Sequence, residues 1–165
     1  MKIFIALGTH KQQFNRLLKA MDKIAGSKAI DAKIFAQIGN SDYEPKHFPF
    51  ARFLRPDEYE KEIKNADVVI SHAGAGSIIT ALQYRKPLII VPRLKKFGEH
   101  TDDHQIDLAK ALDERKKAIA VFNPDELLGA IKKAKDFKPK TESDKEKLIA
   151  RIKGFLEECS CKKRN

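Results

Sequence analysis

Residues 67–105 read DVVISHAGAGSIITALQYRKPLIIVPRLKKFGEHTDDHQ, and this stretch decides the fold that we expect. It contains two continuous apolar runs of strand length, Val68–Ile70 and Leu88–Val91, which are typical of parallel strands covered on both faces. A helix-length segment lies between them, and a polar cluster near Asp102 marks the start of a second helix. The stretch therefore predicts a parallel strand–helix–strand unit.

A turn of small residues follows the first of these strands. After His72, the side chains up to Ser77 are no larger than a methyl or hydroxymethyl group. The backbone of such a turn can pass close to a ligand, and the free amides of the helix that follows favour a phosphate. The alternatives are that Gly74 and Gly76 serve close helix packing, and that His72 satisfies a hydrogen bond at the strand end.

Strand and helix patterns alternate along the rest of the chain. Residues 2–7, 32–38 and 118–122 read as strands, with a short strand expected near 51–54. Helical spacing of apolar residues follows the first strand, at Phe14, Leu17, Leu18, Met21 and Ile24. We expect an α/β fold, a doubly wound, Rossmann-like parallel sheet of about six strands.

Length and composition indicate one domain. The chain has 165 residues with 42% hydrophobic content. Because Pro139 interrupts the helix that starts near Asp125, we expect residues 1–138 to form the ligand-binding domain and 139–165 a C-terminal amphipathic helix with a basic tail. The apolar stripe of that helix packs either on its own sheet or on a partner.

The excess of basic residues narrows the choice of partners. With 33 basic against 23 acidic residues the formal charge is +10, which suits nucleic acid, an anionic membrane face or a phosphorylated small molecule. Nucleic acid is disfavoured because the basic residues are scattered and lack interleaved aromatic residues. No apolar run approaches the roughly 20 residues of a membrane span. We therefore expect a cytoplasmic protein.

Three polar segments fall at the carboxyl ends of predicted strands, where ligands of open α/β sheets bind. They are Gly8–His10, His72–Ser77 and Pro92–Gln105. The last segment ends in four polar residues in one helical turn, Asp102-Asp103-His104-Gln105. A helix cap needs only one short polar side chain, so the cluster is better explained by binding to sugar hydroxyls. Capping remains the alternative for Asp102 and Asp103. The edge therefore predicts a site for a diphosphate joined to a polyhydroxyl ring.

The sequence offers cations rather than a metal to balance a diphosphate. It has no Asp-x-Asp pair of the kind that holds a metal under a nucleotide diphosphate, so no metal is expected. Helix amides with Arg93, Lys95 and Lys96 would neutralise a leaving group instead. The glycine fingerprint GxGxxG is absent as well, so a dinucleotide cofactor is not supported.

The runs VISHAGAGSIITAL and KPLIIVPRLKKFGEHTDDHQ, together with the opening GTHKQQFNRLL, resemble the family-28 glycosyltransferase C-terminal domain. This is the donor-binding half of the GT-B fold. The likeness covers residues 1–121 and is strongest to stand-alone catalytic subunits of two-subunit UDP-sugar transferases. These include the eukaryotic dolichol-linked N-acetylglucosaminyltransferase and bacterial exopolysaccharide and capsule galactosyl- or glucosyltransferases.

The resemblance implies a UDP-sugar donor, with Gln105 on the sugar. The donor-binding residues that it implies are Gly8, Thr9, His72, Gly74, Ala75, Gly76, Ser77, Thr80, Arg93, Asp103, His104 and Gln105. Thr80 departs from the family, because relatives place an acidic residue there to bind the ribose. A hydroxyl still forms a hydrogen bond but is not a charged acceptor.

The resemblance also implies inverting transfer to a lipid-linked acceptor at the cytosolic face of a membrane. Such a step needs a base, for which His10 is the candidate on this chain, or a group on the partner. One domain is half of a GT-B cleft, so the implied assembly is a heterodimer with a membrane-anchored acceptor-domain subunit. The alternative is a non-catalytic, nucleotide-sugar-binding regulatory subunit.

Overall fold

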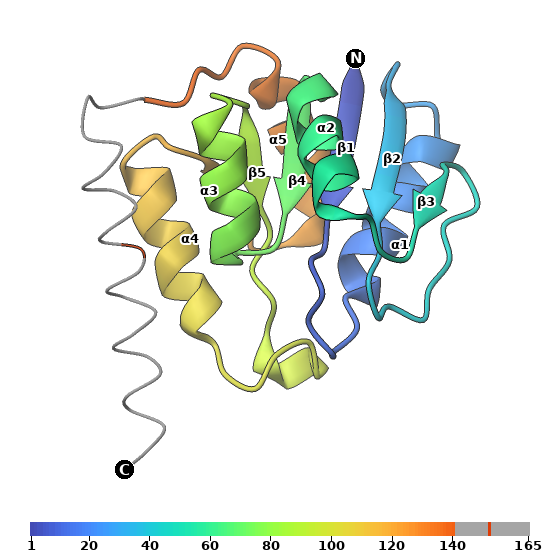
Figure 1. The fold of residues 1–165 in the computed structure, drawn as a ribbon, viewed down its shortest axis with the longest axis horizontal. Coiled ribbons are helices and arrows are strands. Elements are labelled where there is room, and N and C mark those ends of the chain that lie inside the picture. The colour runs from blue at the N-terminus through green and yellow to red at the C-terminus, as the bar shows by residue number, and fades with distance from the viewer. Residues whose placement is uncertain (141–151, 153–165) are drawn as a thin grey trace.

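The computed structural model describes residues 1–140 and residue 152 (Figure 1). Six strands run β1 (Lys2–Ala6), β2 (Lys33–Gln37), β3 (Phe50–Ala51), β4 (Val68–Ser71), β5 (Leu88–Ile90) and β6 (Ile119–Ala120). The helices are α1 (Asn15–Gly26), α2 (Pro56–Asn65), α3 (Ala75–Gln83), α4 (His104–Glu114) and α5 (Leu127–Ala134), with short 3₁₀ turns η1 (Lys95–Phe97) and η2 (Pro124–Glu126).

The strands form one parallel sheet in the order β3-β2-β1-β4-β5-β6. The chain starts in the middle of the sheet, moves out to β3 and returns across β1 to β4. The strand order therefore reverses between β1 and β4, which is the position where open α/β sheets bind ligands. This confirms the predicted doubly wound sheet.

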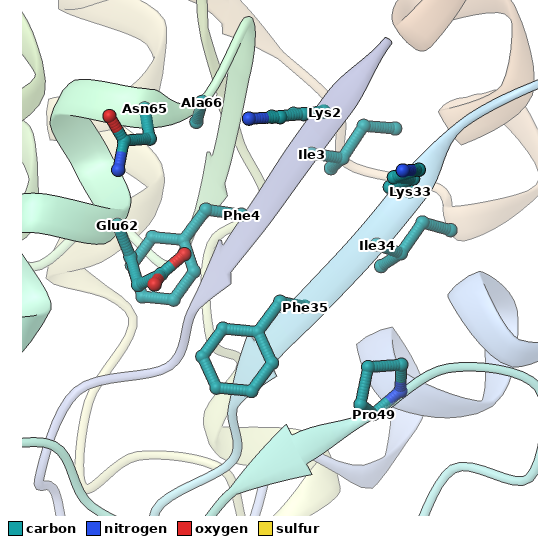
Figure 2. Close-up of a pocket in the computed structure, with 10 residues that line it drawn as sticks. All are labelled: Lys2, Ile3, Phe4, Lys33, Ile34, Phe35, Pro49, Glu62, Asn65 and Ala66. Carbon is teal, nitrogen blue, oxygen red and sulfur yellow. The ribbon is translucent and has the colours of Figure 1, made fainter.

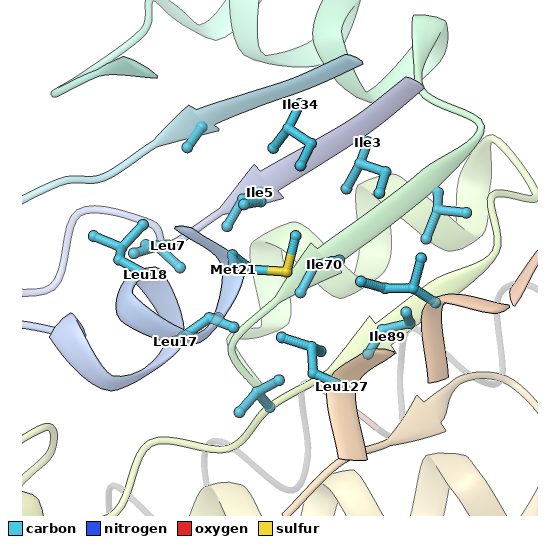
Figure 3. Close-up of a cluster of buried hydrophobic side chains, with 14 of the residues drawn as sticks. Ile3, Ile5, Leu7, Leu17, Leu18, Met21, Ile34, Ile70, Ile89 and Leu127 are labelled. Atoms are coloured by element: carbon cyan, nitrogen blue, oxygen red, sulfur yellow. The ribbon is translucent and has the colours of Figure 1, made fainter. Parts of the chain in front are cut away.

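Helices cover both faces of the sheet, with α1 and α5 on one and α2, α3 and α4 on the other (Figure 1). Alternate residues of β1 face opposite ways: Ile3 and Ile5 join the α1 and α5 core, where Figure 3 shows Met21 against the sheet. Phe4 and Ala6 join the core beneath the other helices. This alternation explains why the buried strands are apolar throughout.

Two of the predicted element boundaries differ from those in the structure. The strand expected near 51–54 is β3, Phe50–Ala51, which pairs with Ala36 and Gln37 at the end of β2. The helix expected from Asp125 starts as the 3₁₀ turn η2, in which the Asn123 side chain accepts a hydrogen bond from the Asp125 amide.

The expected C-terminal helix and basic tail lie outside the described residues, with one exception. Ile152, a member of the predicted apolar stripe, is 4% exposed and belongs to the core that contains Phe4 and Leu112. At this position the stripe packs on its own domain. Within residues 1–140 and 152, no helix is long and apolar enough to cross a membrane.

Candidate binding site at the carboxyl edge of the sheet

The loops after β1 and β5 are joined by Arg93, whose side chain is buried. Its Nη1 atom donates to the carbonyl oxygens of Gln12 and Gln13, both at 2.9 Å, and of Glu99 at 3.1 Å. Its Nη2 atom donates to the Leu7 carbonyl at 3.0 Å. The guanidinium expected to meet a phosphate is thus bound to the main chain beneath the edge. Burial lowers the pKa of Arg93 to about 10, against the opposing effect of Glu99, so the side chain remains a cation near neutral pH.

A buried ion pair between Arg16 and Glu99, which the sequence did not predict, fixes the same loop. Glu99 is fully buried, and its carboxylate accepts from Nε and Nη2 of Arg16 at 2.9 Å each. The amide of Leu94 also donates to this carboxylate at 3.0 Å. Because the bidentate pair joins α1 to the β5–α4 loop, the positions of the edge loops are set by buried charges.

His72 directly follows β4, and its ring explains why two neighbouring positions are glycines. Its ring lies between Gly8 and Gly74, and a Cβ added at these positions would lie 2.8 Å from Cε1 and 2.1 Å from Nε2 of His72. Gly8 also has a φ of +70°. Gly74 therefore has a structural reason to be glycine, its contact with the His72 ring. Burial, followed by the charge of Arg93, lowers the pKa of His72 to about 4, so the ring is neutral near pH 7.

Gly76 has no comparable packing reason, because a Cβ there would meet no atom within 4 Å. It lies in the first turn of α3, where the first hydrogen bond runs from the Ile78 amide to the Gly74 carbonyl at 3.2 Å. The amides of Ala75, Gly76 and Ser77 precede that bond and have no acceptor within the helix. They form an open start of a helix at the switch point of the sheet.

Both hydroxyl groups of α3, those of Ser77 and Thr80, form hydrogen bonds within the domain. Ser77 is buried, and its Oγ accepts from the Tyr59 hydroxyl at 2.7 Å, so its amide rather than its side chain belongs to the edge. Thr80 Oγ1 donates to the Gly76 carbonyl at 2.9 Å. Because the hydroxyl proton of Thr80 is donated to Gly76, this side chain can only accept a hydrogen bond from a ribose hydroxyl, through its oxygen lone pairs.

The polar start of α4 divides into structural and exposed groups. Asp102 Oδ1 accepts from the amide of His104, the first residue of α4, at 3.2 Å. Asp103 Oδ1 accepts from the Lys95 amide at 2.8 Å. Gln105 Oε1 accepts from the Arg93 amide at 3.0 Å, which orients the Gln105 side chain. The exposed His104 ring and the Gln105 NH₂ group are the hydrogen-bonding groups left for a ligand.

The first loop reaches the β5–α4 loop through stacked imidazoles. The rings of His10 and His100 are 4.7 Å apart and inclined by 21°. Asn40, which lies just after β2, fixes this first loop, because its Nδ2 atom donates to the His10 carbonyl at 3.0 Å. The sequence analysis did not identify His100 as a site residue. Its position two residues before Asp102, in the run HTD, could have indicated a contact between the two side chains. The three predicted segments therefore do meet at one edge.

A pocket of about 380 Å³ lies at the opposite edge, beside the amino ends of β1 and β2 (Figure 2). Phe4 and Phe35 line it with stacked rings 6.2 Å apart, flanked by Lys2 and Lys33. It lacks the open helix start found at the carboxyl edge. The carboxyl edge is the better candidate, because it contains the switch point of the sheet.

Comparison with known sequences identifies relatives of this chain. The model of the glycosyltransferase family 28 C-terminal domain matches residues 2–158. The human UDP-N-acetylglucosamine transferase subunit ALG13 is 31% identical over 119 residues, 67% of this chain and 10% of that protein. The subunit of the same name from Kluyveromyces lactis is 31% identical over 132 residues, 79% of this chain and 58% of that protein. The chain thus spans less than two thirds of either relative.

Solved structures share the fold at low sequence identity. The glycotransferase of kitacinnamycin has a TM-score of 0.61 at 20% identity, covering 98% of this chain and 40% of that one. Acinetobacter baumannii MurG has a TM-score of 0.57 at 18% identity, covering 93% and 49%. The solution structure of ALG13 has a TM-score of 0.56 at 16% identity, covering 88% and 91%. These neighbours confirm the expected GT-B type of fold, and the match over residues 2–158 confirms the resemblance seen in the sequence: the chain belongs to the glycosyltransferase family 28 C-terminal domain family.

Proposed function

We propose that this chain is the donor-binding, catalytic subunit of a two-subunit inverting glycosyltransferase that uses UDP-N-acetylglucosamine. The observation that carries the proposal is the open start of α3 at the switch point, where Gly76 leaves space and three amides lack helical acceptors. Such a helix start suits a diphosphate. The names of the relatives support N-acetylglucosamine as the sugar.

The edge offers a group for each part of the donor. The amides of Ala75, Gly76 and Ser77 would bind the diphosphate, and Thr80 one turn later would accept from the ribose. His104 and Gln105 at the start of α4 would bind sugar hydroxyls, with Gln105 oriented by the Arg93 amide.

The reaction that fits these groups is a single displacement. A hydroxyl oxygen of the acceptor attacks the anomeric carbon, the bond from that carbon to UDP breaks, and the hydroxyl proton passes to a base. The base would be His10 or a group on the partner. The helix amides would stabilise the charge that develops on the leaving diphosphate.

We place the acceptor site on a second, membrane-anchored subunit that binds a lipid-linked acceptor. Residues 1–140 form one Rossmann-like domain, and a GT-B cleft needs two. The word subunit in the names of the relatives supports this arrangement. The chain would then work at the cytosolic face of a membrane through its partner, with its charge of +10 favouring anionic lipid.

A non-catalytic regulatory subunit is the second candidate, favoured by Thr80 in place of an acidic residue. Substituting His104 and Gln105 in the reconstituted complex separates the two functions. A catalytic subunit loses both donor binding and transfer, whereas a regulatory subunit loses binding while transfer by the partner survives.

Partner dependence is tested by measuring transfer from UDP-N-acetylglucosamine to a lipid-linked acceptor. The purified chain should transfer almost nothing alone and become active with the membrane protein that copurifies with it. Robust transfer by the purified chain alone would contradict the two-subunit assignment.

A further inference from the structure

The first turn of α3 is contacted from inside the domain by a tyrosine of α2, the helix beside it (Figure 1). The hydroxyl of Tyr59 donates a hydrogen bond to Oγ of Ser77 at 2.7 Å. Ser77 is 6% exposed, and its amide is one of the three at the open helix start. The bond therefore connects α2 to the candidate diphosphate site through a buried side chain.

The ring of Tyr59 has a fixed position on the sheet. Its centroid is 5.5 Å from that of Phe4 in β1, the two rings are inclined by 75°, and Phe4 is 1% exposed. Burial raises the pKa of Tyr59, against the smaller opposing effect of Ser77, so the hydroxyl keeps its proton near neutral pH and can donate it. A phenylalanine would fill nearly the same space, so the packing of the ring does not require the hydroxyl.

The start of α3 depends on few contacts for its order. Its N-cap residue is Gly74, which has no side chain to accept from the first amides. The turn is closed by the bond from the Ile78 amide to the Gly74 carbonyl at 3.2 Å. Thr80 Oγ1 adds a bond to the Gly76 carbonyl at 2.9 Å. Because helix ends fray, a bond from outside the helix, such as that of Tyr59, fixes the amides that precede Ile78.

We propose that Tyr59 is a positioning residue of the donor site, which acts through Ser77 to hold the three amides at the start of α3 in the arrangement that binds a diphosphate. This inference rests on the proposed function and adds to it a residue of α2 that does not itself touch the ligand. An ordered helix start binds an anion more tightly, because the entropy of ordering is not lost during binding.

The probe is UDP-N-acetylglucosamine, and calorimetric titration of the full chain measures its affinity. Tyr59→Phe keeps the ring and removes the hydroxyl. It should bind the donor about fivefold more weakly, the factor that corresponds to one ordinary hydrogen bond. Ser77→Ala removes the same bond from the other side and should weaken binding by a similar factor. The double variant should bind no more weakly than either single variant, because both changes break one bond.

Tyr84→Phe is the matched control, because the hydroxyl of Tyr84 also joins the α3 segment to α2. Tyr84 directly follows α3 and donates to Glu60 Oε1, at the end of the helix away from the donor edge. This variant should keep the affinity of the unchanged chain. Thermal unfolding by circular dichroism verifies that each variant is folded and compares the melting temperatures. A merely structural role of Tyr59 would lower its melting temperature and leave the affinity of the folded chain unchanged.

The outcomes separate this inference from the proposed function. If the unchanged chain does not bind UDP-N-acetylglucosamine, the proposed function fails and this inference fails with it. If it binds and folded Tyr59→Phe keeps the full affinity, the donor site stands and the role of Tyr59 is wrong. An equal loss in Tyr84→Phe, or additive losses in the double variant, would also overturn that role. Should Tyr59→Phe not fold, Ser77→Ala decides, and full affinity of that variant would contradict the inference.

Discussion

The His72 ring, held between Gly8 and Gly74, links acidity to stability. Burial and nearby positive charge lower its pKa in the folded chain to about 4, from 6.5. As the pH falls, the unfolded chain therefore takes up the proton first. The contribution of His72 to the free energy of unfolding is fully present above about pH 6.5 and is lost progressively as the pH falls toward about 4.

We predict that this group removes up to about 3 kcal/mol from the free energy of unfolding across that interval. Urea unfolding at a series of pH values measures the loss. His72→Asn, whose amide cannot take up the proton, should flatten this part of the pH dependence. An equal slope in His72→Asn and in the unchanged chain would show that another group is responsible.

Gly76 offers a test of the donor site that leaves the fold intact. Because a Cβ at this position meets open space, Gly76→Leu should fold with a stability within about 1 kcal/mol of the unchanged chain. The new side chain would cover the amides of α3, so we predict at least about tenfold weaker binding of UDP-N-acetylglucosamine by calorimetry.

Gly129→Leu is the control, since Gly129 is also helical and exposed and has no atom within 4 Å of an added Cβ. It should bind the donor as the unchanged chain does. If Gly76→Leu binds equally well, the helix start is not the diphosphate site.

At the scale of the elements, Arg93 connects the end of β5 to the loops after β1 and before α4. Replacing it with methionine would leave four carbonyl oxygens without their donor. We predict a loss of about 3–5 kcal/mol in the free energy of unfolding, measured with urea. Exposed Arg115→Met should change it by less than about 0.5 kcal/mol. A loss for Arg93→Met as small as that for Arg115→Met would mean that this connection is dispensable.

The sequence predicted the elements well, because strand and helix patterns are local. Apolar runs gave β4 and β5. Buried polar contacts could not be predicted in this way. Asp22 is buried on the inner side of α1, where its carboxylate accepts from the Tyr43 hydroxyl and the Lys46 and His47 amides, contacts that depend on a distant loop.

The sequence also predicted only part of the candidate site, because local patterns place the elements but not the buried side-chain contacts. The order of the strands brings Gly8–His10, His72–Ser77 and the start of α4 to one edge, and alternation of strands and helices was enough to expect this. Which side chains turn inward depends on packing. Arg93 and Ser77 were expected at the ligand, and the Arg93 guanidinium and the Ser77 hydroxyl form hydrogen bonds inside the domain. His100 was not expected and lies against His10.

For the whole molecule, we propose that the parallel sheet is half of a transferase, with its donor edge open toward a partner. The most direct measurement is a titration of the isotope-labelled chain with UDP-N-acetylglucosamine, followed by the chemical shifts of its amides. We predict the largest changes in chemical shift at Ala75, Gly76 and Ser77 and in the loops after β1 and β5. Changes confined to the opposite edge around Phe4 and Phe35, or none at high ligand concentration, would contradict it.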